Sequence, residues 1–183
     1  MDERSRRIAI VAHCILNQNS KVEDTASERG LTKKVVDLLY KYGFGVIQLP
    51  CPEFEYLGLR RFWFSKEQYD NVGFRNYCRR IARKTVELIE NYVKEGYKVP
   101  LVIGISGSPS CGVEKTSSSK WRGNPMNIEG KIEIVEGSGV LMEEIRKEVS
   151  ENNLKVRFVD YSDMEEEKSL AKIEDLIKRS IRR

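Results

Sequence analysis

Short apolar runs alternate with longer amphipathic stretches along this chain of 183 residues. The apolar runs are rich in valine and isoleucine, a composition typical of buried β-strands. They cover residues 7–12, 45–49, 101–105 and 155–160, with a shorter candidate at 132–135. The amphipathic stretches repeat apolar residues at helical spacing. They cover residues 31–42, 76–95, 137–148 and 164–181.

This alternation of strands and helices predicts an α/β fold with an open parallel sheet, Rossmann- or flavodoxin-like, and helices on both faces. The length suits a single domain over residues 1–183. Residues Gly112–Glu136 show no clear helical period, and such long connections in a compact domain are often lids or binding segments. We therefore expect an active-site loop there, with Lys120, Trp121 and Arg122 as its candidate lid; a solvated loop is the alternative.

Charge and hydropathy narrow the class of protein. The chain has 32 Lys and Arg against 28 Asp and Glu, a net charge of +4 that makes no strong case for nucleic acid. We interpret the basic cluster at residues 79–84 as a solvated helix face. No apolar run approaches the ~20 residues of a membrane span, and the N-terminal residues do not resemble a signal peptide. We expect a cytoplasmic protein without a membrane partner; its oligomeric state is open.

Three of the four cysteines come at the ends of predicted strands. Cys14 follows the first strand, Cys51 follows the second, and Cys111 closes a Ser-, Gly- and Pro-rich turn after the third. The carboxyl ends of parallel strands meet at one sheet edge, so these cysteines are expected to converge there. Pro52 keeps Cys51 out of helical geometry. Cys78 lies in a predicted helix, and we interpret it as a buried structural residue.

Disulfides are rare in the cytoplasm, which makes metal binding or catalysis the better explanation for such cysteines. Three thiolates can hold one tetrahedral zinc with water as the fourth ligand, or three irons of a [4Fe-4S] cluster. In the cluster, the fourth iron stays open to a substrate. Zinc sites usually draw on closely spaced pairs such as C-x-x-C, which this chain lacks. Three buried structural cysteines are the remaining alternative.

Four motifs, in this order, resemble the DUF523 family of thiouracil desulfidases. They are Cys-Ile-Leu-Asn at 14–17, Pro-Cys-Pro-Glu at 50–53, Ser-Pro-Ser-Cys-Gly at 108–112 and Gly-Ser-Gly-Val at 137–140. The similarity extends from the first strand to about Asp160. It implies a [4Fe-4S] cluster held by Cys14, Cys51 and Cys111. In this family the open iron takes sulfur from a thiolated base or a similar compound without net redox chemistry.

The resemblance also favours catalytic roles for Glu53 and Ser108. A carboxylate beside a cluster ligand can activate water or protonate a ring nitrogen, and Ser108 in the turn can hydrogen-bond the substrate or a cluster sulfur. His13, the single histidine, is a candidate proton donor, with a structural hydrogen bond as the alternative. After Glu53 the chain departs from the family, because residues 54–64 are aromatic instead of glycine-rich. The identity of the thiolated substrate therefore stays open.

We predict a [4Fe-4S]-dependent desulfidase that releases sulfide from a small thiolated compound, such as a thiolated nucleobase. The alternative is a non-catalytic iron–sulfur or metal protein, either a sensor or store or a three-cysteine zinc site. An RNA-binding module is suggested only by the basic helix and the aromatics. Residues 137–139 can offer N–H groups to an anion at a helix start, but they lack the dinucleotide fingerprint. Asn17 and Asn19 either line the pocket or shape the loop after the first strand.

Overall fold

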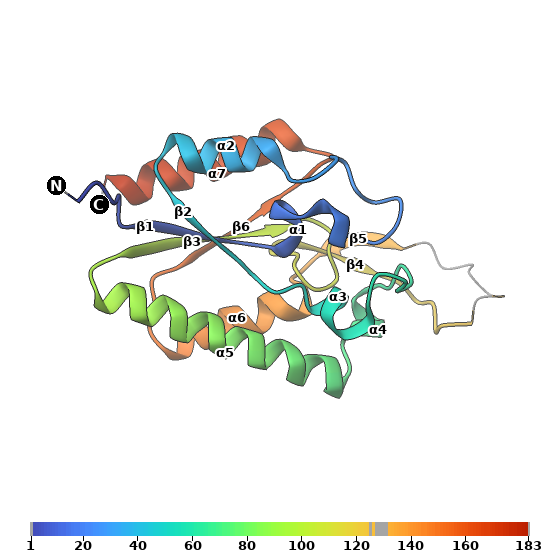
Figure 1. Ribbon diagram of the computed structural model, residues 1–183. Coiled ribbons are helices and arrows are strands. Elements are labelled where there is room, and N and C mark those ends of the chain that lie inside the picture. The colour runs from blue at the N-terminus through green and yellow to red at the C-terminus, as the bar shows by residue number, and fades with distance from the viewer. Residues whose placement is uncertain (1, 125, 127–131, 183) are drawn as a thin grey trace.

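A four-stranded parallel sheet lies at the centre of the protein, as the sequence predicts (Figure 1). The structure is a computed structural model, and it describes residues 2–124, 126 and 132–182. The strands are β1 (Arg7–Val11), β2 (Gly45–Gln48), β3 (Lys98–Ile105) and β6 (Arg157–Tyr161). They lie in the order β2-β1-β3-β6, and every neighbouring pair is parallel. The topological switch point of the sheet lies between β1 and β3, because the chain moves from β1 outward to β2 on one side and from β3 outward to β6 on the other. Ligands are expected at the carboxyl edge of these two strands.

Two pairs of helices cover the two faces of the sheet (Figure 1). One face carries α2 (Lys33–Lys41) and α7 (Glu166–Ile181), and the other carries α5 (Val72–Lys94) and α6 (Val140–Glu151). This arrangement confirms the predicted α/β fold. Helix α5 begins four residues earlier than its hydrophobic period indicates. The reason is a cap, since Asn71 Oδ1 accepts a hydrogen bond of 3.0 Å from the Phe74 N–H.

The basic cluster of α5 is not the purely solvated face that its sequence suggests. Arg79 Nε lies 3.1 Å from Oε2 of the buried Glu144 of α6, and Arg83 Nε lies 3.3 Å from Glu148 Oε1. These ion pairs tie α5 to α6. They also leave less free positive charge for RNA than the sequence alone suggests.

Segment Gly112–Glu136 contains a β-hairpin where the sequence predicts mainly a loop. Strand β4 (Lys115–Ser118) pairs antiparallel with β5 (Glu133–Glu136), which confirms the short strand expected near residue 132. Strand β4 was missed because its polar sequence Lys-Thr-Ser-Ser has no apolar run. Residues 125 and 127–131 lie outside the described residues, and the expectation of an active-site loop there stays a prediction.

Four short helices were also missed, because one or two turns are too short to show a hydrophobic period. They are α1 (His13–Leu16), the 3₁₀ turn Gln18–Ser20, α3 (Pro52–Leu57) and α4 (Lys66–Tyr69). Helix α3 follows directly from the Cys-Pro step. Cys51 is its extended N-cap, with φ −85° and ψ 107°, and Pro52 is its first residue. The expectation that Cys51 stays extended is thereby confirmed.

Glu67 of α4 holds the β4–β5 hairpin through hydrogen bonds that we expect to be sensitive to acid. It accepts hydrogen bonds from Ser118 Oγ at 2.6 Å, the Ser119 N–H at 3.0 Å and Ser65 Oγ at 2.5 Å. Burial opposes ionisation, but these bonds outweigh it and lower the pKa of Glu67 from 4.5 to about 2. A lowered folded-state pKa stabilises the protein above the unfolded pKa, and this stability is lost as the pH falls toward the folded pKa.

We therefore expect wild type to be more stable to urea than Glu67→Gln at pH 7, and the difference to shrink between about pH 4.5 and pH 2. Unfolding curves of both proteins across this range measure the difference directly. An equal difference at all pH values would contradict the assigned role of Glu67.

Within the described ranges, every helix falls short of the length or the hydropathy needed to span a bilayer. The cytoplasmic location expected from the sequence stays a prediction.

Candidate active site

The turn after β3 brings Cys111 back to the end of that strand. The Ile105 N–H donates to the Cys111 carbonyl at 3.0 Å, and the Cys111 N–H donates to Ser108 Oγ at 3.0 Å. Asp160 of β6 holds the chain that follows, because its carboxylate accepts the N–H groups of Val113 at 2.7 Å and Glu114 at 2.8 Å. Cys111 is thus fixed by its own turn and by the neighbouring strand.

The start of α6 supports the same turn. The Gly139 N–H donates to the Gly112 carbonyl at 2.8 Å, the Val140 N–H to Pro109 at 3.0 Å, and the Leu141 N–H to Ser110 at 3.0 Å. The Gly137 N–H likewise donates to the Glu114 carbonyl at 2.9 Å. The amides of both glycines are therefore not available to an anion, which contradicts the sequence-based alternative of an anion site at residues 137–139. The glycine-containing motif serves the Cys111 turn instead.

Gly139 allows the close approach of α6 to that turn. A Cβ atom at this position would lie 2.4 Å from the Ser110 carbonyl carbon and 2.8 Å from the Pro109 oxygen. We expect Gly139→Ala to lower the free energy of unfolding by about 1–3 kcal/mol, the usual cost of overpacking, or more because backbone cannot rotate away. Urea unfolding measures this. Gly30→Ala is the matched control, because a Cβ there meets nothing within 4 Å, and an equal loss in both variants would contradict the steric explanation.

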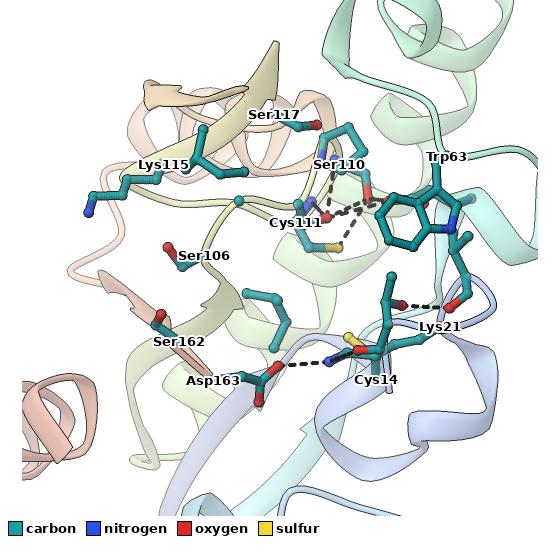
Figure 2. Close-up of a pocket in the computed structure, with 18 of the residues that line it drawn as sticks. Cys14, Lys21, Trp63, Ser106, Ser110, Cys111, Lys115, Ser117, Ser162 and Asp163 are labelled. Atoms are coloured by element: carbon teal, nitrogen blue, oxygen red, sulfur yellow. Dashed lines mark hydrogen bonds and ion pairs between the residues drawn. The ribbon is translucent and has the colours of Figure 1, made fainter. Parts of the chain in front are cut away.

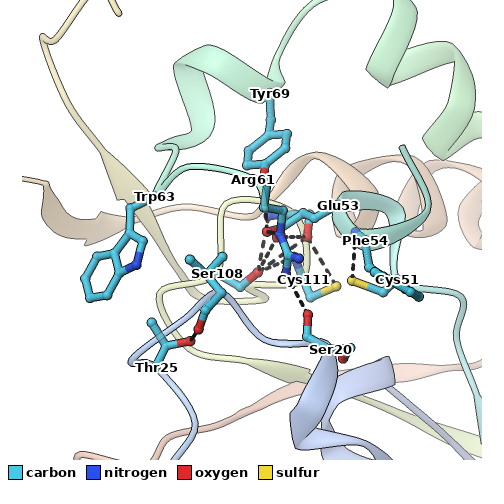
Figure 3. A network of polar contacts seen from close by, with 12 residues as sticks. Ser20, Thr25, Cys51, Glu53, Phe54, Arg61, Trp63, Tyr69, Ser108 and Cys111 are labelled. Atoms are coloured by element: carbon cyan, nitrogen blue, oxygen red, sulfur yellow. Dashed lines mark hydrogen bonds and ion pairs between the residues drawn. The ribbon is translucent and has the colours of Figure 1, made fainter. Parts of the chain in front are cut away.

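Cys14, Cys51 and Cys111 line one cavity of about 790 Å³ at the carboxyl edge of the sheet (Cys14 and Cys111 in Figure 2, Cys51 in Figure 3). Cys14 comes from α1 just after β1, Cys51 caps α3 after β2, and Cys111 ends the turn after β3. Cys51 and Cys111 are buried and Cys14 is half-buried; all are free thiols. Cys78 is buried within α5 and does not line the cavity. The structure therefore brings together the three cysteines that follow strands and separates the fourth.

The three thiols are held in their neutral form. Burial, followed by Cys51 and Glu53, raises the pKa of Cys14 to about 12. Burial, followed by the charge of Glu53, raises the pKa of Cys51 to about 11. Burial also raises the pKa of Cys111 well above its usual value, helped by Cys51 and Cys14. Metal binding to these thiols therefore requires the release of protons.

The three thiols are the candidate ligands for a metal ion or an iron–sulfur cluster. Among the described residues, no three Cys, His, Asp or Glu side chains converge closely enough to hold one metal ion. A single zinc needs its sulfur ligands about 4 Å apart, whereas in an iron–sulfur cubane each cysteine binds a different iron. The Ser110 hydroxyl lies 3.5 Å from Cys111 Sγ, but its single proton is donated to Glu53 Oε1 at 2.5 Å. The Cys51 sulfur has a donor of its own, the Phe54 N–H at 3.4 Å. Such donors tune cluster potentials. Cys14, Cys51 and Cys111, which line one cavity from three strand ends, are therefore the residues that could hold a [4Fe-4S] cluster.

Glu53 lies beside the thiols at the centre of a buried polar network (Figure 3). Its Oε2 accepts from Arg61 Nε at 3.3 Å and from the Tyr69 hydroxyl at 3.2 Å. Its Oε1 accepts from Ser110 Oγ at 2.5 Å and from Ser108 Oγ at 3.4 Å. We call these five residues the Glu53 network. They hold the carboxylate in one orientation, with its Oε1 side toward the turn that carries Cys111.

Arg61 is the buried counter-charge of Glu53. Its side chain is only 2% exposed, and it also donates to the Ser20 carbonyl at 2.7 Å and the Gly58 carbonyl at 3.2 Å. These contacts place its charge against Glu53 and give each of its three nitrogens a hydrogen-bond acceptor, which a buried guanidinium needs. Tyr69 is equally buried, and burial followed by the negative charge of Glu53 raises its pKa well above the usual value. Tyr69 is therefore a neutral donor to Glu53.

Of the other residues that the sequence suggested for the site, one lines the cavity and the rest do not. His13 lines the cavity, and its buried Nδ1 has no hydrogen-bond partner in the described part of the chain. Asn17 shapes the loop, since its Oδ1 accepts from the Asn19 N–H at 3.2 Å, and neither asparagine lines the cavity. Lys120, Trp121 and Arg122 do not line it either, so the structure gives no support to a lid formed by them.

Sequence reasoning missed Arg61, Tyr69 and the role of Ser110. Arg61 comes from the aromatic-rich segment 54–64 and Tyr69 ends α4, and neither carries a motif of its own. Ser110 belongs to the Ser-Pro-Ser-Cys-Gly motif. Its position next to the predicted ligand Cys111 was the one signal available in the sequence, and the structure shows that its side chain is fully buried.

Comparisons with known proteins identify the family and the fold of this chain. Residues 6–159 match the family described as "Putative 2-thiouracil desulfurase". An uncharacterized protein of Methanocaldococcus jannaschii is 34% identical over 177 residues, which span 96% of this chain and 99% of the relative. Among solved structures, the [4Fe-4S]-dependent thiouracil desulfidase TudS matches 91% of this chain and 97% of its own, with a TM-score of 0.51 and 16% identity. At that identity the match shows a shared fold.

Proposed function

This chain belongs to the 2-thiouracil desulfurase family, and we propose that it is an iron–sulfur-dependent desulfidase acting on a small thiolated compound. In the proposed reaction, water replaces the sulfur of a C=S group, as in a thiolated nucleobase. The products are a C=O group and sulfide, and no electrons are exchanged. One observation carries the proposal: thiols from three strand ends line one cavity together with the buried carboxylate of Glu53.

Cys14, Cys51 and Cys111 are the proposed ligands of a [4Fe-4S] cluster. When bound through three cysteines, such a cluster supplies one iron free of protein ligands, a Lewis acid with high affinity for sulfur. The fold of the TudS structure and the absence of a closely spaced cysteine pair both support this assignment.

The proton transfers of the proposed reaction are assigned to the Glu53 network. We propose that Glu53 takes a proton from the attacking water and returns one to the leaving sulfur or to a ring nitrogen. Arg61 and Tyr69 engage Oε2, which leaves Oε1 as the oxygen directed toward the serines of the turn. The Ser108 hydroxyl is the proposed contact to the substrate, because it lines the cavity and its bond to Glu53 is long, at 3.4 Å.

Anaerobic reconstitution with iron and sulfide tests the proposal. We expect about four irons and four sulfides per chain, with a broad absorption band near ~400 nm. The loaded protein is then expected to release sulfide from 2-thiouracil or 4-thiouracil and to form uracil, measured by chromatography. A cluster without sulfide release would favour a non-catalytic iron–sulfur protein, and uptake of zinc without iron would favour a three-cysteine zinc site.

A further inference from the structure

The cavity extends well beyond the three cysteines. Its volume of about 790 Å³ is typical of a site for a drug-sized ligand. A thiolated pyrimidine has about eight heavy atoms and occupies about 240 Å³ if each takes the volume of a liquid water molecule. A base and an eight-atom cluster together therefore leave room for further substrate atoms. We define the outer compartment as the part of the cavity lined by Lys21, Trp63, Lys115, Ser117 and Asp163 (Figure 2).

Ser117 provides the clearest sign of a ligand in this compartment. It is 4% exposed, it lines the cavity, and its Oγ has no hydrogen-bond partner in the described ranges. Side chains alternate along β4. Thr116 and Ser118 point the other way and are satisfied, by the Ser108 carbonyl at 3.1 Å and by Glu67 at 2.6 Å. A buried hydroxyl without a partner is unfavourable, which indicates that a polar group of a bound molecule pairs with it.

The charges of the outer compartment disfavour an anionic ligand. Lys21 Nζ lies 2.9 Å from Asp163, and Lys115 Nζ lies 3.5 Å from Glu165. Both lysines that line the cavity thus have a carboxylate partner, and Glu136 adds a third carboxylate to the lining. A phosphate here would meet more negative than positive charge, whereas a neutral hydroxyl group can bond to serine, lysine and carboxylate alike.

Trp63 supplies the apolar wall. Its Nε1 donates to the Glu23 carbonyl at 3.0 Å, which fixes the indole while its ring lines the cavity. An indole held in this way packs against flat or ring-shaped groups with little loss of conformational entropy.

We infer that the outer compartment binds a neutral, hydroxyl-bearing substituent on the thiolated ring. The preferred substrate is then the size of a nucleoside: larger than a free base and without a phosphate. This inference rests on the proposed function for its thiolated ring, but the compartment and its chemistry are independent of the reaction.

A substrate series with two variants tests the inference. The cluster-loaded enzyme is assayed for sulfide release from 2-thiouracil, 2-thiouridine and 2-thiouridine 5′-monophosphate. Calorimetry on the same protein measures the binding of uracil, uridine and uridine 5′-monophosphate, which have no sulfur to lose. Ser117→Ala removes the unpaired hydroxyl. Ser118→Ala is the matched control, since it makes the same change at the next residue on the opposite face.

We expect 2-thiouridine to exceed 2-thiouracil in kcat/KM by tenfold or more, with no further gain from the phosphate. Ser117→Ala is expected to weaken uridine binding and to lower kcat/KM for 2-thiouridine by about three- to tenfold more than for 2-thiouracil, the effect of one hydrogen bond. Its melting temperature should not fall, because the hydroxyl has no partner to lose. Ser118→Ala should leave the substrate preference unchanged and lower the melting temperature, because it loses the bond to Glu67.

Equal kinetics for base and nucleoside, or a tenfold gain from the phosphate, would overturn the inference. So would a lower melting temperature of Ser117→Ala with an unchanged preference. Failure of the proposed function looks different, because sulfide is then released from none of the three compounds. In that case calorimetry still decides: tighter binding of uridine than of uracil supports the outer compartment, and equal binding overturns it.

Discussion

Alanine at Cys51 is expected to reduce the iron content of the reconstituted protein from about four per chain to less than one, and sulfide release to background. The same loss is expected for Cys14→Ala and Cys111→Ala. Each thiol comes from a different strand end, and the cavity offers no further cysteine to replace it. Removal of one ligand therefore leaves a second iron exposed, and such a cluster is readily lost. Iron and sulfide analysis of the three variants measures this directly.

Cys78→Ala is the matched control for these variants. Cys78 is as buried as Cys51 and Cys111, but it lies within α5 and outside the cavity. We expect Cys78→Ala to keep about four irons per chain and to lose only the packing of one sulfur. Loss of the cluster in Cys78→Ala, or full iron content in any of the other three variants, would contradict the ligand assignment.

Glu53→Gln is expected to lower sulfide release by about 10²–10⁴-fold while the iron content stays unchanged. The amide cannot accept a proton from water. Its NH₂ group also faces donors on either side, Arg61 and Tyr69 on one and the serine hydroxyls on the other. Steady-state rates on the loaded enzyme, with iron counted in the same sample, separate catalysis from cluster loss.

Glu53→Gln is also expected to lower the free energy of unfolding, and this effect must be separated from the loss of catalysis. Glu53→Gln leaves the guanidinium of Arg61 buried without its counter-charge, which costs about 3–5 kcal/mol. The double variant Glu53→Gln with Arg61→Met removes both charges and is expected to recover part of this stability. It should not recover activity. Recovery of both stability and activity would show that Glu53 acts only as a structural partner of Arg61.

Much of the fold and of the thiol set could be predicted from the sequence. The apolar runs that form β1, β2, β3 and β6 are local signals, because a strand buried on both faces must be apolar throughout. The cysteines follow these runs at short separation. The rule that parallel strands share one carboxyl edge was then sufficient to bring Cys14, Cys51 and Cys111 together. The structure confirms that they line one cavity.

The polar half of the site could not be predicted in the same way. Arg61 is recognisable as a buried charge only when Glu53, the Ser20 carbonyl and the Gly58 carbonyl surround it. Ser117 lies in a strand without an apolar run, which forms because β5 pairs with it. Residues 137–139 are typical of an anion site by sequence, yet their neighbourhood consists of carbonyls of the Cys111 turn.

The sequence by itself thus determined the α/β fold, the family and the three thiols at one edge of the sheet. Hydrophobic periodicity and short motifs encode these features, because they depend on residues close together in the chain. Only the tertiary structure decided the orientation of Glu53, the counter-charge of Arg61 and the extent of the outer compartment. These features depend on desolvation and on contacts between distant segments, 57 residues apart for Ser110 and Glu53 and 142 residues apart for Lys21 and Asp163. Such contacts leave no period or motif in the chain.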